Sequence, residues 1–216
     1  MCASYMIKQR SVPRLVTEVR IDDFESYHNL LIAPHRPAPV IVAQDQNHTL
    51  KTMKFSLTPR WSKEAKPKFA THNARIETIS EKPTWKEAFQ KRHCLVPMTH
   101  FIEPIYEGEH AGYMVAFHRS DEGWLMAAGI WEEWVDKKSG EVTESFSIIT
   151  GEPPRFIAKM GHDRCPIFLE GCAQKDWLRL NDSPKAMIDF LNQKRSEQSF
   201  NVENFRPMKP GWEKRK

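Results

Sequence analysis

The sequence predicts an α+β fold, a single domain in which peripheral helices surround a curved, mainly antiparallel, barrel-like β-sheet. Fifteen prolines are spread through the 216 residues, which favours many short elements over a bundle of long helices. Short runs rich in Val, Ile, Phe and Trp recur between turn residues, as is typical of strands. No clean linker divides the chain, so we predict one domain over residues 1–216.

Seven segments have the composition of strands, and four have the spacing of helices. The predicted strands are residues 40–43, 53–57, 94–97, 113–117, 124–130, 146–150 and 166–169. The predicted helices are residues 84–91, 154–159, 174–180 and 184–194. The first helix begins with a capping-box pattern, in which Thr84 is the expected N-cap and Glu87 follows three residues later.

The composition is that of an ordinary globular chain with a small positive charge. Hydrophobic residues make up 40%, and 32 Lys and Arg against 28 Asp and Glu give a net charge of +4, which is compatible with a nucleic-acid partner. No apolar run approaches the roughly 20 residues of a membrane span, and the first residues do not have the pattern of a secretory signal. The four cysteines form no C-x-x-C pair, so we expect free thiols and a cytoplasmic location.

Basic and aromatic residues cluster in two places. Segment 60–68 combines Trp61 with four basic residues, a mixture that suits single-stranded nucleic acid. Segment 209–216 is also basic, but there we expect a solvated, frayed terminus.

The second residue, Cys2, can acquire chemistry that no internal cysteine has. If Met1 is removed, Cys2 carries an α-amine and a thiol on adjacent carbons. The amine of such a 1,2-aminothiol condenses with an aldehyde to a Schiff base, and the thiol then closes a five-membered thiazolidine. Reference pKa values of roughly 7.7–8.0 for the amine and about 8.5 for the thiol make both groups reactive near neutral pH. A cysteine at this position can also be incidental, so its interpretation depends on other residues.

Three polar motifs, far apart in the chain, contain the other candidate residues. The first contains Asn73, which offers donors and an acceptor, and Arg75, whose planar fork fits phosphate. In the second, Glu103 follows an apolar run, so burial is expected to raise its pKa toward the range in which carboxyl groups transfer protons. In the third, His162 is expected to titrate near neutral pH, and Arg164 can bind phosphate or carboxylate. Taken singly, each motif also fits a surface turn, a strand-edge glutamate or a loop histidine.

In order and spacing, these motifs resemble the SRAP (SOS response-associated peptidase) family, whose members shield abasic sites in DNA. The resemblance extends from residue 2 to about residue 180 and is weak over the C-terminal tail 195–216. It rests on Cys2, Pro59-x-Trp61, Asn73-Ala74-Arg75-x-Glu77-Thr78, Glu103, Ala128-Gly129-Ile130-Trp131-Glu132, Phe146-x-Ile148-Ile149-Thr150 and His162-x-Arg164-x-Pro166.

The resemblance implies a chemistry centred on Cys2. Members of the family are understood to remove their own initiator methionine and to react through the exposed cysteine with the ring-opened aldehyde of an abasic deoxyribose in single-stranded DNA. The product is a thiazolidine DNA–protein crosslink. By match, Asn73 would orient the N-terminal residue and the opened sugar. Glu103 would transfer protons and assist the loss of Met1, and His162 would protonate a sugar oxygen and help reversal.

The resemblance also implies a DNA-binding surface. Arg75 and Arg164 would hold flanking phosphates, and Trp61 would stack on a base or wedge the strand. The family usually begins Cys-Gly-Arg, whereas this chain has Ser4 where the arginine is expected, so its contacts with phosphate are fewer or lie elsewhere. The resemblance implies no cofactor and no membrane partner. The expected partner is single-stranded DNA containing abasic sites, bound by a monomer that acts at the bacterial nucleoid or is encoded by a phage.

Two other functions fit the same residues. Cys2, His162 and Asn73 can form a Cys–His–Asn set, which would make the protein a cysteine-nucleophile peptidase or amidase acting on other proteins. Such an enzyme would not need the phosphate-binding pair of arginines. A non-catalytic nucleic-acid-binding domain would need the basic and aromatic surface but not Cys2. A metal site is disfavoured, because no second close pair of ligands accompanies His162 and Cys165.

Overall fold

A computed structural model describes residues 4–8 and 25–215 of the chain. Its strands are β1 Ser4–Ile7, β2 Leu30–Ile32, β3 Pro37–Gln44, β4 Asn47–Phe55, β5 Asn73–Arg75, β6 His93–Met98, β7 His100–Pro104, β8 Tyr113–Arg119, β9 Leu125–Val135, β10 Val142–Gly151, β11 Cys165–Pro166 and β12 Phe200–Pro207. Its helices are α1 Lys86–Lys91, α2 Arg155–Lys159, α3 Cys172–Arg179 and α4 Pro184–Lys194, with the short 3-10 helices η3 Glu25–Tyr27 and η4 Trp212–Arg215. The predicted α+β class is confirmed.

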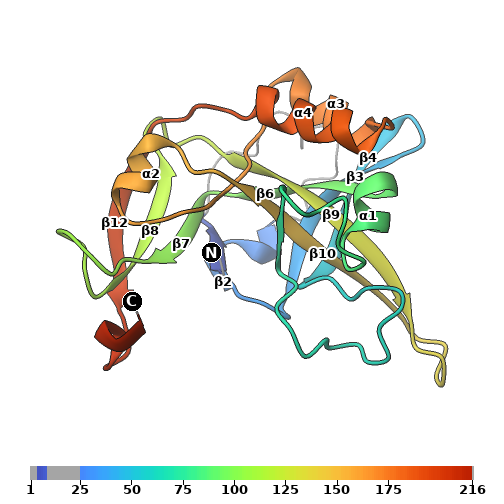
Figure 1. The fold of residues 1–216 in the computed structure, drawn as a ribbon, viewed down its shortest axis with the longest axis horizontal. Helices are drawn as coiled ribbons and strands as arrows, with labels where there is room; N and C mark the ends of the chain where they lie inside the picture. The colour runs from blue at the N-terminus through green and yellow to red at the C-terminus, as the bar shows by residue number, and fades with distance from the viewer. Residues whose placement is uncertain (1–3, 9–24, 216) are drawn as a thin grey trace.

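Five strands close into a barrel in the order β10, β4, β3, β6 and β9, and β9 pairs with β10 again (Figure 1). All neighbours are antiparallel except β4 and β10, which run parallel. The strands approach closely at Gly129 in β9, where an added Cβ would lie 2.8 Å from the Sγ of Cys94 in β6. Glycine therefore fits this position, and the barrel-like sheet expected from the sequence is confirmed.

A second sheet has five antiparallel strands in the order β12, β8, β7, β1 and β2, and forms the left part of the molecule in Figure 1. One of its faces meets the barrel. The ring of Tyr5 in β1 lies edge-on to Phe55 in β4, with centroids 5.5 Å apart. On the same face, Phe101 of β7 stacks on Phe117 of β8 at 4.8 Å. These rings are fully buried, so aromatic packing holds the two sheets together.

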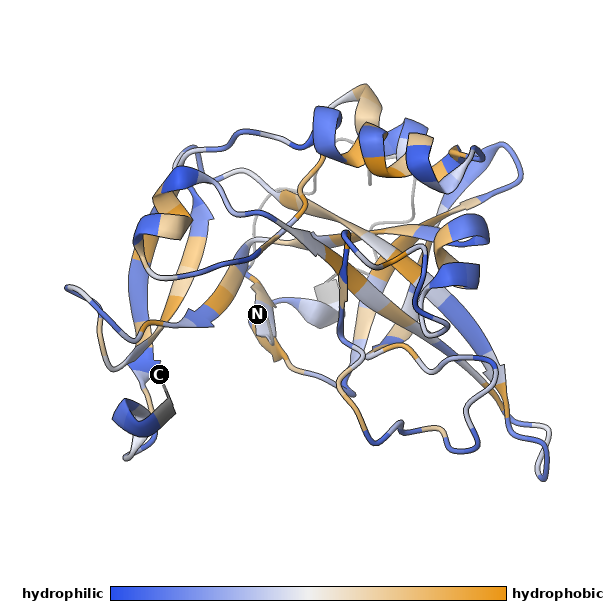
Figure 2. Cartoon of the chain, viewed as in Figure 1, coloured by the Kyte–Doolittle hydropathy of each residue, from blue (hydrophilic) through white to orange (hydrophobic). Residues whose placement is uncertain are grey.

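The hydropathy of the chain follows this arrangement. Figure 2 shows hydrophobic residues concentrated in the strands of both sheets and hydrophilic residues in the loops and on the helices. Within the described part of the chain, no helix has the length and apolar character needed to cross a membrane. Cys94, Cys165 and Cys172 are free, as the sequence predicted.

The helices lie outside the barrel and begin in different ways. Helix α3 is fixed by Trp177, whose Nε1 donates to the Cys94 carbonyl at 3.1 Å and whose ring stacks on His93 at 3.9 Å. Helix α4 has the predicted bounds, and the hydroxyl of Ser183 caps it by accepting the N–H of Ala186.

The capping box predicted at Thr84 is wrong. Helix α1 has Trp85 as its N-cap, and no side chain caps it. The carbonyl of Lys82 already accepts hydrogen bonds from the backbone N–H groups of Trp85 and Lys86. The backbone turn before the helix therefore takes over the role that the threonine hydroxyl was expected to have.

Candidate active site

Glu103 lies in β7, the central strand of the second sheet. Because side chains alternate along a strand, it shares the barrel-facing side with Phe101. Glu103 is fully buried, and burial, with a smaller contribution from the charge of Asp163, raises the pKa of its carboxyl to about 7. Such a group can both give and take a proton near neutral pH. The expected desolvated carboxyl is therefore confirmed.

His162 lies over the same face of the second sheet. It follows α2 across a turn in which Gly161 has a φ of 87°, a conformation that favours glycine. Its ring lies edge-on to Phe117, with centroids 6.2 Å apart, and Phe117 stacks on Phe101. The fold thus brings the histidine motif and the Glu103 motif to one side of one sheet, although they are far apart in the chain.

The protonation of His162 differs from the sequence-based expectation. Burial lowers its pKa to about 4, although the charge of Asp163 acts in the opposite direction. Its expected titration near neutral pH is therefore wrong, because the sequence could not show how deeply the ring is buried. The imidazole is neutral at pH 7, and its buried Nε2 has no hydrogen-bond partner among the described residues.

Asp163, which was not among the residues predicted from the sequence, influences both groups. Its charge raises the pKa of Glu103 and of His162. Its position in the polar motif, directly after His162, could have indicated from the sequence that Asp163 lies near the site.

Asn73 lies on the barrel side of the same interface. It begins β5, which runs parallel to β10, and it is 9% exposed. The ring of the preceding residue, His72, lies edge-on to Phe55 at 5.9 Å. Phe55 is also the ring that Tyr5 of the second sheet contacts. The segment that contains Asn73 therefore borders the interface where the acid–base residues lie.

The two candidate phosphate-binding arginines have different surroundings. Arg164 is largely buried; its Nη2 donates to Glu77 Oε2 and to the Thr150 carbonyl, each at 2.7 Å, and its Nε donates to the Thr150 hydroxyl at 3.2 Å. Arg75 is exposed and pairs with Thr150 only as a backbone partner in the sheet. The Arg164–Glu77 pair joins two of the motifs found in the sequence, a link that their opposite charges could have suggested.

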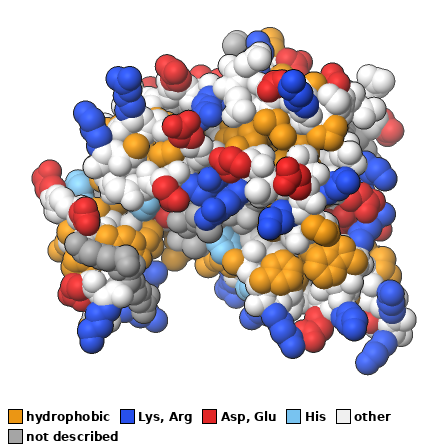
Figure 3. Space-filling view, in the orientation of Figure 1, with side chains coloured by type: hydrophobic (Ala, Val, Ile, Leu, Met, Phe, Trp, Pro, Cys, Tyr) orange, Lys and Arg blue, Asp and Glu red, His pale blue; other side chains and the backbone are white. Residues whose placement is uncertain are grey.

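Trp61 lies in the loop between β4 and β5 and is 56% exposed. It stacks on Phe69, which is 48% exposed, with centroids 6.3 Å apart. Figure 3 shows large hydrophobic side chains at the surface over this part of the molecule. An exposed aromatic pair in a lysine-rich loop is available to a partner with flat rings and negative charge.

The loop that presents Trp61 is held in place from both sides. Arg60 Nε donates to the buried carboxylate of Glu132 at 2.8 Å, and Trp134 Nε1 donates to the Ser62 carbonyl at 2.8 Å. The residues on either side of Trp61 are therefore anchored to the barrel strand β9, and the Trp61 ring itself donates from Nε1 to the Pro83 carbonyl at 3.2 Å.

The structure brings Glu103, Asp163 and His162 to one face, with the Asn73 segment beside them. Cys2 lies outside the described residues. The first described residue, Ser4, pairs with Ile102, the neighbour of Glu103 in β7. A search of the described residues finds no group of His, Cys, Asp or Glu able to hold a metal ion.

The structure is thus that of a β-rich protein in which a closed five-stranded barrel packs against an antiparallel sheet. A buried carboxyl and a half-buried histidine lie on the barrel-facing side of that sheet. The chain belongs to the SOS response associated peptidase (SRAP) family, whose family model matches residues 1–206. The family resemblance inferred from the sequence is thereby confirmed.

Relatives extend over most of the chain. It is 28% identical to the abasic site processing protein YoaM of Bacillus subtilis over 182 residues, which covers 82% of this chain and 79% of YoaM. It is 25% identical to the abasic site processing protein HMCES of Xenopus tropicalis, covering 70% of this chain and 54% of HMCES. A crystal structure of a Bacteroides thetaiotaomicron protein shares the fold with a TM-score of 0.76 at 24% identity, covering 95% of this chain and 92% of that protein.

Proposed function

We propose that this protein forms a covalent thiazolidine crosslink through Cys2 with abasic sites in single-stranded DNA, after autocatalytic loss of Met1. Relatives that match most of the chain are named abasic site processing proteins. The proposal assigns to this chain the same class of substrate and a reaction that its own residues can perform.

The observation that carries the proposal is the environment of Glu103. Its carboxyl is fully buried and has a pKa of about 7, so both protonation states are populated at neutral pH. Ser4, which follows Cys2 by two positions in the sequence, pairs with Ile102 beside it, so the described part of the chain begins next to the strand that holds this acid.

The reaction needs proton transfers but no oxidant or reductant. The Cys2 amine adds to the aldehyde carbon of the ring-opened deoxyribose, and the adduct loses one water to give a Schiff base. We assign to Glu103 the protonation of the departing hydroxyl, which leaves as water while the Schiff base keeps its N–H as an iminium ion. The Cys2 thiol then adds across this C=N bond: its sulfur bonds to carbon, and its proton goes to the Glu103 carboxylate, which restores the acid.

The other residues of the site would orient the sugar. His162 is neutral at pH 7, so it would exchange hydrogen bonds with a sugar oxygen rather than act as a cationic acid. Asn73 would orient the opened sugar and the N-terminal residue.

The DNA-binding residues would act outside the chemistry. The exposed Arg75 would bind a phosphate, and Trp61 would stack on a base. Arg164 would hold the two motifs in place through Glu77 and Thr150 and present its Nη1, which no described residue binds, to a phosphate.

Intact-mass measurement tests the proposal. The purified protein should have the mass of the chain without Met1, and incubation with an abasic oligonucleotide should add the mass of the DNA less one water. Cys2→Ala should abolish this heat-stable product. Cys172→Ala, which removes an exposed free thiol elsewhere, is the matched control and should leave it intact.

The role of Glu103 in processing is tested separately. Glu103→Ala should slow the loss of Met1 if the removal is internal. Quantitative retention of Met1 in protein that still forms the product would contradict the mechanism.

A further inference from the structure

A pocket of about 330 Å³ lies on the face of the second sheet opposite to Glu103. Its floor is formed by Pro104 of β7, Met114 of β8 and Arg206 of β12. These three residues are in register across the sheet, so their side chains lie side by side. Alternation along β7 directs Pro104 to the face opposite to Glu103, its immediate neighbour.

The C-terminal tail forms the other wall. The N–H of Met208 donates to the Gly112 carbonyl at 2.7 Å, and η4 places Trp212 against the same glycine. A Cβ at Gly112, whose φ is 85°, would lie 3.1 Å from the Trp212 ring. The ring of Tyr106 lies 6.5 Å from that of Trp212. The frayed terminus expected over 209–216 is therefore wrong for the described part of the tail, because an aromatic ring packs against a bare backbone.

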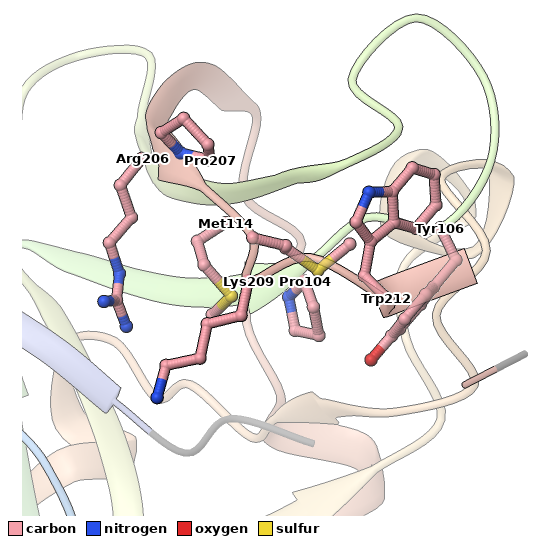
Figure 4. Close-up of a pocket in the computed structure, with 8 residues that line it drawn as sticks. Pro104, Tyr106, Met114, Arg206, Pro207, Lys209 and Trp212 are labelled. Carbon is pink, nitrogen blue, oxygen red and sulfur yellow. The ribbon is translucent and has the colours of Figure 1, made fainter. Parts of the chain in front are cut away.

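The pocket combines flat rings with positive charge. Figure 4 shows Tyr106 and Trp212 together on one side, while the side chains of Arg206 and Lys209 extend together on the other. Both cations are exposed, and no described carboxylate forms an ion pair with either. Two cations beside an aromatic pair, with the apolar side chains of Pro104 and Met114 between them, match a nucleotide, whose base stacks on rings and whose phosphate binds guanidinium and ammonium groups.

We propose that this pocket binds one nucleotide of the single strand that flanks the abasic site, so the inference rests on the proposed function. Pro104 directly follows Glu103, and a strand passing over the end of β7 can therefore reach both the reactive site and the pocket. The family match ends at residue 206, so Lys209 and Trp212 lie beyond it. The pocket thus supplies phosphate contacts in a chain that has Ser4 where the family arginine is expected.

Reversible binding tests the pocket. The probe is a labelled single strand with a central tetrahydrofuran abasic analogue, which has no aldehyde and cannot crosslink. Trp212→Ala should weaken its binding by about 5- to 150-fold, the loss of one stacked base. Arg206→Gln with Lys209→Gln should reduce the slope of log affinity against log salt by about 1.4, since each lost contact to a single strand removes about 0.7.

The matched control is Lys185→Gln with Lys214→Gln, which also removes two positive charges but from exposed positions outside the pocket. It should leave the affinity within a factor of two of the wild type and the salt slope unchanged. Equal losses in the two double variants would mean that general charge, not the pocket, attracts DNA, and would overturn the proposal.

Strand length and position give two further readouts. Probes shortened from one end should bind wild type and Trp212→Ala equally once the nucleotide that occupies the pocket is removed. A 5-iodouracil placed at that nucleotide should photocrosslink to Tyr106 or Trp212. Photocrosslinks that never reach either ring, from any position in the strand, would refute the pocket.

The two proposals can fail separately. If the aldehyde-bearing strand forms the Cys2 product at wild-type yield while Trp212→Ala binds the analogue normally, the pocket is wrong and the proposed function stands. If no covalent product forms with wild-type protein, the proposed function is wrong.

Discussion

The barrel and the second sheet each bury one glutamate, in opposite electrostatic surroundings. In the barrel, Glu132 accepts from Arg60 Nε at 2.8 Å and from Arg92 Nη2 at 2.5 Å, so its carboxylate ties three segments together. In the second sheet, burial is the largest influence on Glu103 and raises its pKa to about 7. Depth of burial alone therefore does not determine the role of a buried carboxyl group; the groups around it contribute as well.

The largest expected effect is on the reaction itself. Glu103→Gln keeps the shape of the side chain but cannot transfer a proton, so the rate of product formation should fall by about 10²- to 10⁴-fold. Quenched time courses with an abasic oligonucleotide measure this rate. An unchanged rate would show that another group transfers the proton. Glu103 and Glu132 would then not differ in their role in the reaction.

Glu132→Gln should lower the stability of the protein and leave the reaction rate nearly unchanged. The change removes the buried carboxylate from two guanidinium groups, which keep only the more distant Glu87 at 3.7 Å, and it should lower the free energy of unfolding by about 3 kcal/mol. We take the lower end of the usual range because the Arg60 side chain is 49% exposed. Urea titrations measure the loss. The crosslinking rate of the folded protein should stay within a few-fold of the wild type, and a larger fall would show that Glu132 supports the site as well as the loop.

The pH dependence of stability sharpens the comparison further. The pKa of Glu103 rises from 4.5 to about 7 on folding, so between these values the native state binds more protons than the unfolded state. Stability from this group is complete below pH 4.5 and is lost as the pH rises to about 7, by about 3 kcal/mol. Unfolding of wild type and Glu103→Gln at several pH values measures it, and curves that stay parallel would show that Glu103 does not titrate there.

The smallest expected effects are those of Arg75 and Arg164, which should differ in whether DNA binding or stability is lost. Arg75→Gln should reduce the salt slope of DNA binding by about 0.7 and leave the melting temperature unchanged, because its guanidinium is exposed. Arg164→Gln should lower stability by about 1–3 kcal/mol, because it breaks buried hydrogen bonds to Thr150. Salt titrations and thermal melts of both variants decide it. Equal behaviour in both assays would show that their different surroundings have no consequence.

Much of the barrel could be predicted from local sequence. The barrel strands β3, β4, β6, β9 and β10 all overlap predicted segments, because β-branched and aromatic residues in short runs favour strands wherever the chain places them. Strands β1, β2, β5, β7 and β12 of the described chain were not predicted. Of these, β5 has only three residues, two of them polar; β7 has the sequence of an apolar run with one acid; and β12 is an exposed edge strand with charged residues.

The site was predictable in its residue types but not in its electrostatics. A carboxyl after an apolar run could be expected to have a raised pKa, and Glu103 does. The lowered pKa of His162 depends on Phe117 and on other chain segments that cover it, and these contacts are tertiary. The bonds that hold Arg164 likewise come from Glu77 and Thr150, which no local pattern connects to it.

The parallel pairing of β10 with β4 has a consequence for the order in which the chain folds. The hairpins β3–β4 and β9–β10 join neighbours in sequence and can form early, whereas closing the barrel brings β10 against a strand made much earlier in the chain. Such non-local pairing is slow, on the order of milliseconds to seconds. On the ribosome, the acid in β7 emerges long before β10 and the histidine motif that complete its surroundings. Any proton transfer by Glu103 that depends on its buried surroundings is therefore expected to begin only when nearly all of the chain has been synthesised.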